Sequence, residues 1–116
     1  MTDPRVAAQL QRERERRLAA IFAADVAGYS RLMAADEVGT LQGLTDCRRI
    51  LDETIAAYRG RIANTAGDSV LAEFPTVVEA INCAIDAQSK LHRANSSLAA
   101  DRQINFRVGV HLGDVM

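Results

Sequence analysis

Residues 61–74 read Arg-Ile-Ala-Asn-Thr-Ala-Gly-Asp-Ser-Val-Leu-Ala-Glu-Phe, and this stretch decides the fold. Two short runs, Arg61 to Ala66 and Ser69 to Phe74, are separated only by Gly67-Asp68. A two-residue connection that begins with glycine is typical of a β-hairpin, because the tight turn needs a positive φ at that position. We therefore predict two antiparallel strands, the second of which ends before Pro75.

The sequence before the hairpin predicts a strand and a long helix. Leu18 to Ala24 is an uncharged apolar run, which indicates a central strand that is apolar on both faces. After a turn at Ala27-Gly28, apolar residues recur at intervals of three and four from about Asp36 to Tyr58, which predicts a helix. Gly60 follows this helix, and we expect it to form a left-handed cap. The expected buried face of the helix is Val38, Leu41, Leu44, Cys47, Leu51, Ile55 and Tyr58.

The sequence after the hairpin predicts a second long helix and a last strand. Thr76 followed by Glu79 is a capping box, which begins the helix. Apolar residues then alternate with other residues from Ile104 to Leu112, which is the pattern of a half-buried strand. The expected buried residues of the second helix are Ala80, Ile81, Ala84, Ile85 and Leu91.

The order of these elements is β-α-β-β-α-β, which predicts an α+β fold of the ferredoxin-like sandwich type. A helical crossover makes the first two strands parallel, and the hairpin reverses the direction of the third. In the usual version of this topology, the third strand lies beside the first and runs antiparallel to it. The end of the first strand, at Asp25, then lies beside the start of the third, at Asp68.

The composition indicates one domain and excludes several classes of function. The chain has 116 residues, 48% of them hydrophobic, and a net charge of −1, so no global field attracts it to nucleic acid or a membrane surface. Its longest apolar run is much shorter than the roughly 20 residues of a membrane span, and its beginning lacks a signal-peptide pattern. Cys47 and Cys83 are isolated, which favours buried thiols over a disulfide or metal cluster. We expect a cytoplasmic protein with a charged arm over residues 1–16 and one domain over residues 17–116.

Two aspartates in this topology predict a metal site. Asp25 lies in the stretch Phe-Ala-Ala-Asp-Val-Ala-Gly-Tyr-Ser at 22–30, and Asp68 lies in the hairpin turn. Two carboxylates at one sheet edge repel each other unless a cation lies between them, and Mg²⁺ prefers oxygen ligands of this kind. Taken alone, each aspartate is better explained by a structural role: Asp25 can cap the turn that follows it, and Asp68 can occupy the hairpin turn. Their combination with Gly28 and Gly67 favours the metal site, beside a helix start where backbone N–H groups can hold phosphate.

Three segments together resemble the class III adenylate and guanylate cyclase catalytic domain. They are residues 22–30, 60–74 and 106–115, and the last reads Phe-Arg-Val-Gly-Val-His-Leu-Gly-Asp-Val. The likeness extends over about residues 17–116 and is greatest to bacterial members, which often carry C-terminal modules such as tetratricopeptide repeats. It implies conversion of ATP to cyclic AMP and pyrophosphate, in which two Mg²⁺ or Mn²⁺ ions assist attack of the ribose 3′-hydroxyl on the α-phosphate.

The resemblance also implies roles for individual residues. Asp25, Asp68 and the carbonyl of Val26 match the metal-binding positions, and no catalytic residue beyond these ligands is identified. Asn64 stands where well-studied adenylate cyclases have a lysine that selects adenine, and an amide can hydrogen-bond a purine edge in either sense. The positions expected to bind the nucleotide are Ala27, Gly28, Tyr29, Ser30, Asn64 and Gly67. Other polar residues, expected to be structural or solvated, are Glu73, Arg107, His111 and Asp114.

The resemblance further implies a head-to-tail homodimer with its active site at the interface. The family's second specificity residue, and an asparagine and an arginine that stabilise the transition state, have no counterpart up to Met116. We therefore expect a partial domain that folds but does not turn over ATP alone. The alternatives are a guanylate cyclase, a non-catalytic dimerisation or nucleotide-sensing module, and a receiver domain phosphorylated on Asp25. The last needs an alternating parallel β/α pattern, which the hairpin disfavours.

Overall fold

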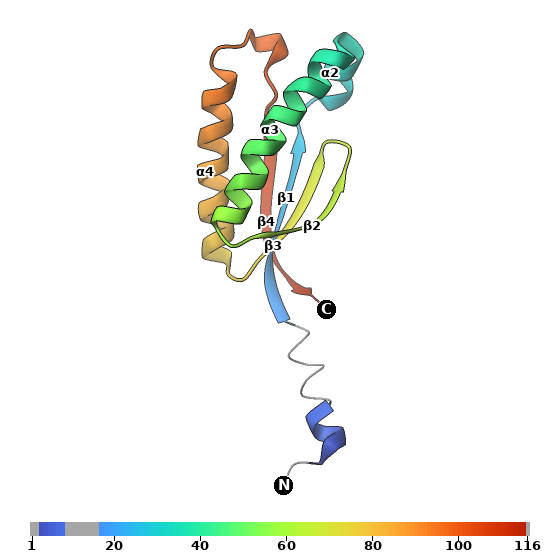
Figure 1. The fold of residues 1–116 in the computed structure, drawn as a ribbon, viewed down its shortest axis with the longest axis vertical. Helices are drawn as coiled ribbons and strands as arrows, with labels where there is room; N and C mark the ends of the chain where they lie inside the picture. Colours follow the sequence, from blue (N-terminus) through green and yellow to red (C-terminus); the bar gives the residue numbers. More distant parts are fainter. Residues whose placement is uncertain (1–2, 9–16, 116) are drawn as a thin grey trace.

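The fold is a four-stranded antiparallel sheet with two long helices packed on one face (Figure 1). The computed structural model describes residues 3–8 and 17–115. Residues 1–2, 9–16 and 116 lie outside the described residues, so the predicted arm over residues 1–16 stays a prediction. The elements are β1 (Arg17–Val26), α2 (Tyr29–Ala35), α3 (Glu37–Ala57), β2 (Arg61–Ala66), β3 (Ser69–Phe74), α4 (Val77–Asn95), the short 3₁₀ helix η1 (Ala100–Arg102) and β4 (Phe106–Val115).

The topology confirms the predicted ferredoxin-like α+β arrangement. The strand order is β2-β3-β1-β4, and β1 pairs antiparallel with both β3 and β4. The hairpin forms as predicted, with Ala66 opposite Ser69 and Gly67 at a φ of 56°. Thr76 caps α4 by accepting from the N–H of Glu79, which confirms the predicted helix start, and its hydroxyl donates to the Glu79 carboxylate at 3.3 Å. An all-antiparallel sheet excludes the doubly wound parallel fold of a receiver domain.

The hydrophobic core lies between the sheet and the α3–α4 layer. Phe22 of β1 and Phe74 of β3 pack against each other at its centre, with ring centroids 5.8 Å apart and ring planes tilted by 53°. Both predicted free thiols are buried in this core. Burial raises the pKa of Cys47, and raises that of Cys83 to about 11, so both stay protonated and unreactive near neutral pH. The core residues of β1, β3, α3 and α4 are Ala20, Phe22, Ala24, Val26, Val70, Ala72, Phe74, Leu44, Cys47, Leu51, Ile55, Ala80, Cys83, Ala87 and Leu91.

The sheet has one covered face and one open face, which corrects the prediction for β1. Ala20, Phe22 and Ala24 point into the core, whereas Ala23 on the opposite face is exposed and Asp25 is half-buried. On that face Ala19 is buried and Ile21 is half-buried, so the run is buried on both faces only at its start and opens to solvent towards Asp25. Leu112, expected to be half-buried, is 56% exposed because β4 continues beyond the end of the helix layer (Figure 1).

The buried faces of the two long helices are confirmed in part: Leu44, Cys47, Leu51, Ile55, Ala80 and Leu91 are buried as predicted, and four other predicted residues are exposed. Val38 and Leu41 of α3 are exposed, as are Ile81 and Ile85 of α4. Polar or small residues take their places: Thr40, Thr54, Cys83 and Ala87 are buried. The threonines can be buried because each hydroxyl donates to a carbonyl oxygen, that of Leu32 at 2.9 Å and that of Ile50 at 2.7 Å.

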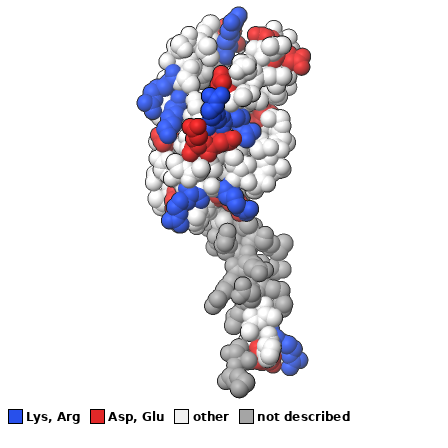
Figure 2. All heavy atoms as spheres, in the orientation of Figure 1, with Lys and Arg blue, Asp and Glu red and all other residues white. Residues whose placement is uncertain are grey.

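The surface above the helices carries charges of both signs. Figure 2 shows acidic and basic side chains interspersed over the described part of this face. Several form short-range pairs along α3, such as Arg48 with Asp52 and Arg49 with Asp46. In the described ranges, no helix has the length and apolar character needed to cross a bilayer.

Gly60 follows α3 for a different reason from the one predicted. The left-handed residue is Arg59, with a φ of 68°, and Gly60 itself has no positive φ. A Cβ on Gly60 would lie 2.5 Å from ring carbons of Phe74 and 2.8 Å from Cγ2 of Ile55. The glycine is needed because the chain passes directly over the aromatic core as it enters β2.

This close approach predicts a large effect of Gly60→Ala. The new methyl group overpacks the core, and we expect the free energy of unfolding to fall by about 2 kcal/mol. Gly109→Ala is the matched control, because no atom lies within 4 Å of the corresponding Cβ position. Urea unfolding of both variants measures the difference, and equal stabilities would contradict this account of Gly60.

Candidate active site

The pairing of β1 with β3 brings the two predicted aspartates to one end of the sheet. Ala24 lies opposite Val70, so the end of β1 lies beside the hairpin turn that contains Asp68. The backbone N–H of Val26 donates to Oδ2 of Asp68 at 2.9 Å. Asp68 is thus held directly against the residue that follows Asp25, as the topology predicted. Its Oδ1 keeps its lone pairs for another ligand.

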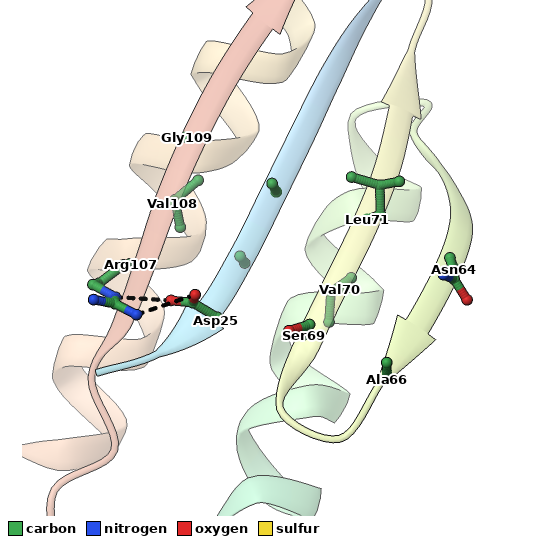
Figure 3. Close-up of a pocket in the computed structure, with 11 residues that line it drawn as sticks. Asp25, Asn64, Ala66, Ser69, Val70, Leu71, Arg107, Val108 and Gly109 are labelled. Carbon is green, nitrogen blue, oxygen red and sulfur yellow. Dashed lines mark hydrogen bonds and ion pairs between the residues drawn. The ribbon is translucent and has the colours of Figure 1, made fainter. Parts of the chain in front are cut away.

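Arg107 on β4 is the residue of this site that the sequence did not reveal. It lies opposite Asp25 in the β1–β4 register. Its Nε donates to Oδ1 of Asp25 at 2.8 Å, and its Nη2 donates to Oδ2 at 3.1 Å (Figure 3). The hydrogen bond to Asp25, then the charges of Asp25 and Asp68, raise the pKa of Arg107. We expected a solvated or structural arginine; its side chain is 69% exposed, and the structure adds that the guanidinium engages both oxygens of a predicted metal ligand.

A cavity of about 390 Å³ opens beside this ion pair on the uncovered face of the sheet. Small residues form its floor, and no atom lies within 4 Å of the position that a Cβ on Gly109 would occupy. Asp25 and Arg107 form one wall, and Asn64 of β2 lies across the sheet from them (Figure 3). The lining residues are Ala23, Ala24, Asp25, Asn64, Ala66, Ser69, Val70, Leu71, Arg107, Val108 and Gly109.

A β-bulge places Asn64 on the rim of this cavity. The register between β2 and β3 shifts between Ile62 and Asn64, so Ala63 has no partner in the ladder. A bulge of this kind re-aims the side chain that follows it. The exposed amide of Asn64 therefore lines the same cavity as Asp25, although it comes from the far edge of the sheet.

The predicted phosphate-binding turn lies beside the cavity and does not line it. Gly28 has a φ of 67° and precedes α2, and the N–H of Ala27 donates to the carbonyl of Asn105 at 2.8 Å. Tyr29 packs against the core, and Ser30 is exposed. Gly67 likewise serves the hairpin turn without lining the cavity. The residues from Ala27 onward follow Asp25 closely in the chain between β1 and α2, and Gly67 directly precedes Asp68 in the hairpin.

The chemistry of the donor set fits hard divalent cations. Asp25, Asp68 and the carbonyl of Val26 supply oxygen only, which suits Mg²⁺ or Mn²⁺ rather than zinc. A protein cation already stands at Asp25, because the guanidinium of Arg107 engages both of its oxygens. The described residues contain no group of three or more His, Cys, Asp or Glu side chains that could hold a metal. Such a site would therefore complete its coordination with water and ligand oxygens.

Glu73 and His111 lie on the same open face and take no part in the cavity. Glu73, for which the sequence suggested no partner, pairs with Arg61 of β2 at 2.8 Å. His111 lies opposite Ile21 in the β1–β4 register and is exposed. The side chain of Asp114 lies outside the described ones.

Comparison with known proteins identifies the family. The family model of the adenylate and guanylate cyclase catalytic domain matches residues 10–116 of the sequence. The chain belongs to this family. It is 46% identical over 102 residues to a protein named "Putative adenylate cyclase 3" from Rhizobium meliloti (strain 1021), a match that covers 87% of this chain and 17% of that protein. The chain thus spans a small part of the length of that relative.

Solved structures of cyclases have the same fold. An adenylate/guanylate cyclase/hydrolase from Silicibacter pomeroyi superposes with a TM-score of 0.79 and is 40% identical, over 86% of this chain and 59% of that one. The adenylyl cyclase CyaB from P. aeruginosa superposes with a TM-score of 0.71 over 85% of this chain and 57% of that one. CyaB is 18% identical, so this second likeness concerns the fold alone. Members of the cyclase family typically use two divalent metal ions, which agrees with the donor set.

The hydrogen bond from Val26 to Asp68 leads to a prediction about stability. Asp68→Ala removes the acceptor of a partly buried N–H, so the free energy of unfolding in metal-free buffer should fall by about 1 kcal/mol. Asp68→Asn keeps an acceptor oxygen and should stay within about 0.5 kcal/mol of the unsubstituted chain. Urea unfolding with EDTA present distinguishes the two. Equal losses in both variants would show that the bond does not hold the turn.

Proposed function

We propose that this chain is the catalytic domain of an adenylate cyclase, which converts ATP to 3′,5′-cyclic AMP and pyrophosphate in intracellular signal transduction. The observation that carries the proposal is the convergence of Asp25, which lines a cavity together with Arg107 and Asn64, and Asp68, which does not line it and is hydrogen-bonded to the residue after Asp25. Membership of the cyclase family implies a nucleotide substrate. The name of the relative that is 46% identical favours ATP over GTP.

The two aspartates are the proposed metal ligands. Asp25, Asp68 and the carbonyl of Val26 would hold two Mg²⁺ or Mn²⁺ ions. Bound there, the ions would supply the positive charge that lowers the pKa of the ribose 3′-hydroxyl and neutralises the leaving pyrophosphate. The hydrogen bond from Val26 fixes Asp68, so this carboxylate is positioned before any ligand binds.

The remaining proposed roles follow from the position of each residue around the cavity. Arg107 gives the wall next to Asp25 a positive charge suited to phosphate oxygens. The turn from Ala27 to Ser30 is the proposed phosphate-binding segment: the N–H of Ala27 is used by Asn105, so the N–H groups from Gly28 onward would serve, and Gly28 lets a ligand approach the backbone closely. Asn64, across the cavity, is the proposed contact to the purine edge, with one donor and one acceptor.

A head-to-tail homodimer is the proposed active form. The cavity lies on the open face of the sheet, where no described element covers it, so another chain can close it. A partner would also supply the transition-state groups that the resemblance implies. A cytoplasmic location, with no nucleic acid or membrane partner, stays a prediction.

Two alternatives share the fold. A guanylate cyclase is compatible with the amide of Asn64, because an amide can hydrogen-bond guanine as well as adenine. A non-catalytic nucleotide-sensing module would keep the cavity and lack turnover. Both are outcomes of the experiments that follow.

Turnover of ATP tests the proposed function directly. The complete natural protein, incubated with MnCl₂ and ATP, is expected to produce cyclic AMP. Asp25→Asn and Asp68→Asn should each lower the rate on the order of a hundredfold, because each removes a charge that faces the reacting phosphates. Asp46→Asn is the matched control, since Asp46 lies on α3 and pairs only with Arg49 in the described structure.

The possible results separate the alternatives. Cyclic AMP formation that both active-site variants retain would contradict the metal assignment. Nucleotide binding without cyclic nucleotide formation would support the sensing module, and cyclic GMP as the main product would support a guanylate cyclase.

Asn64 is expected to set the purine preference. Asn64→Ala removes the donor and the acceptor that face the base, so the kcat/KM ratio for ATP over GTP should fall about tenfold towards one. Rates with each nucleotide, measured on the complete protein, give this ratio. An unchanged ratio would place the base elsewhere in the cavity.

A further inference from the structure

Both carboxylate oxygens of Asp25 accept a hydrogen bond before any ligand binds. Arg107 donates to both of its carboxylate oxygens, at 2.8 Å and 3.1 Å, from the opposite position on β4. The fork of a guanidinium matches a carboxylate in this two-bond arrangement, which orients the pair more strictly than a single contact does. A metal ion that binds Asp25 therefore competes with the guanidinium for the same two oxygens.

The charges at the site make this competition stronger. Asp25 and Asp68 carry one negative charge each, and Arg107 adds one positive charge close to both, so the group has a net charge of −1. A divalent ion would meet a net charge of −2 without the guanidinium. It would also be repelled by the guanidinium if this stayed in place, because like charges at close range oppose each other even in water.

We propose that Arg107 acts as an electrostatic lock on Asp25, which lowers the affinity of the nucleotide-free chain for divalent metal ions. This inference rests on the proposed function in one respect, namely that Asp25 is a metal ligand. It adds that the metal site is occupied by a cation of the protein itself until that cation is moved. Arg107 is in this respect a positioning residue for the carboxylate.

The ion pair between Arg61 and Glu73 provides a matched control. It joins neighbouring strands at 2.8 Å, as the Arg107–Asp25 pair does. The two arginines are almost equally exposed, 70% for Arg61 and 69% for Arg107. Arg61 does not line the cavity, and its pair with Glu73 has one hydrogen bond where the Arg107–Asp25 pair has two. The control therefore tests whether removal of any cross-strand arginine on this face changes the affinity for Mn²⁺.

Binding of Mn²⁺ alone tests the lock without any turnover. The free ion is measured by electron paramagnetic resonance in a titration of the 116-residue chain without nucleotide. Arg107→Gln is expected to bind Mn²⁺ about tenfold more tightly than the unsubstituted chain, by removal of one nearby positive charge. Arg107→Lys keeps the charge and should stay within about threefold of the unsubstituted chain, as should Arg61→Gln. Circular dichroism confirms that each variant is folded.

A second measurement uses nuclear magnetic resonance to follow the side chain of Arg107 as metal is added. Addition of diamagnetic Mg²⁺ to the ¹⁵N-labelled chain should shift the Nε–H resonance of Arg107, because the ion competes with this N–H for Oδ1 of Asp25. The side-chain resonance of Arg61 should not move.

The outcomes distinguish this inference from the proposed function. Equal Mn²⁺ affinity in the unsubstituted chain and Arg107→Gln would overturn the lock and leave the metal site intact. No Mn²⁺ binding in any variant would also overturn the lock, and the proposed function is tested separately by the turnover of ATP. A tenfold gain in Arg61→Gln as well would show a general effect of net charge, which also contradicts a specific lock.

Discussion

The antiparallel pairing of β1 with β3 is the constraint on which the site depends. It aligns Ala24 with Val70 and so places the end of one strand against the turn that opens the other. The hydrogen bond from Val26 to Asp68 closes this junction. A shift of the register by one residue would turn Phe22 out of the core and move Asp25 to the covered face, so the packing of the core and the position of the carboxylates are set together. The site therefore inherits its rigidity from Phe22 and Phe74, which lie at the centre of the core.

The second constraint is that helices cover only one face of the sheet. The sequence places bulky residues on the covered face of β1 and small ones, such as Ala23, on the other. Gly109 on β4 continues this small surface, and together they leave room for a cavity of about 390 Å³. Charged and polar side chains then stand only at its edges, from Asp25 and Arg107 to Asn64. A nucleotide needs this combination of a flat, weakly polar floor and a charged end.

Much of this arrangement is predictable from local sequence signals, and what is not depends on tertiary register. The hairpin at Gly67-Asp68 and the capping box at Thr76 are local, so the order of elements and the meeting of Asp25 with Asp68 could be predicted. Arg107 was missed because its partner is fixed only when β4 pairs with β1. The attraction between opposite charges on neighbouring strands is a signal that a search over strand registers can use. The helix faces were predicted only in part for a similar reason: Thr40, whose hydroxyl is satisfied by the carbonyl of Leu32, is buried at the start of α3 while Val38 and Leu41 are exposed. Gly60 shows the same limit, since its clash with Phe74 arises across the fold.

The central claim is that Asp25 and Asp68 bind divalent metal ions jointly, beside a nucleotide. A crystal structure of the protein with Mn²⁺ and a non-reactive ATP analogue, with anomalous scattering recorded for manganese, tests it most directly. The account predicts anomalous peaks at about 2.1 Å from carboxylate oxygens of both residues, with the base near Asn64. Peaks that contact neither aspartate, or a nucleotide bound on the helix-covered side of the molecule, would contradict it.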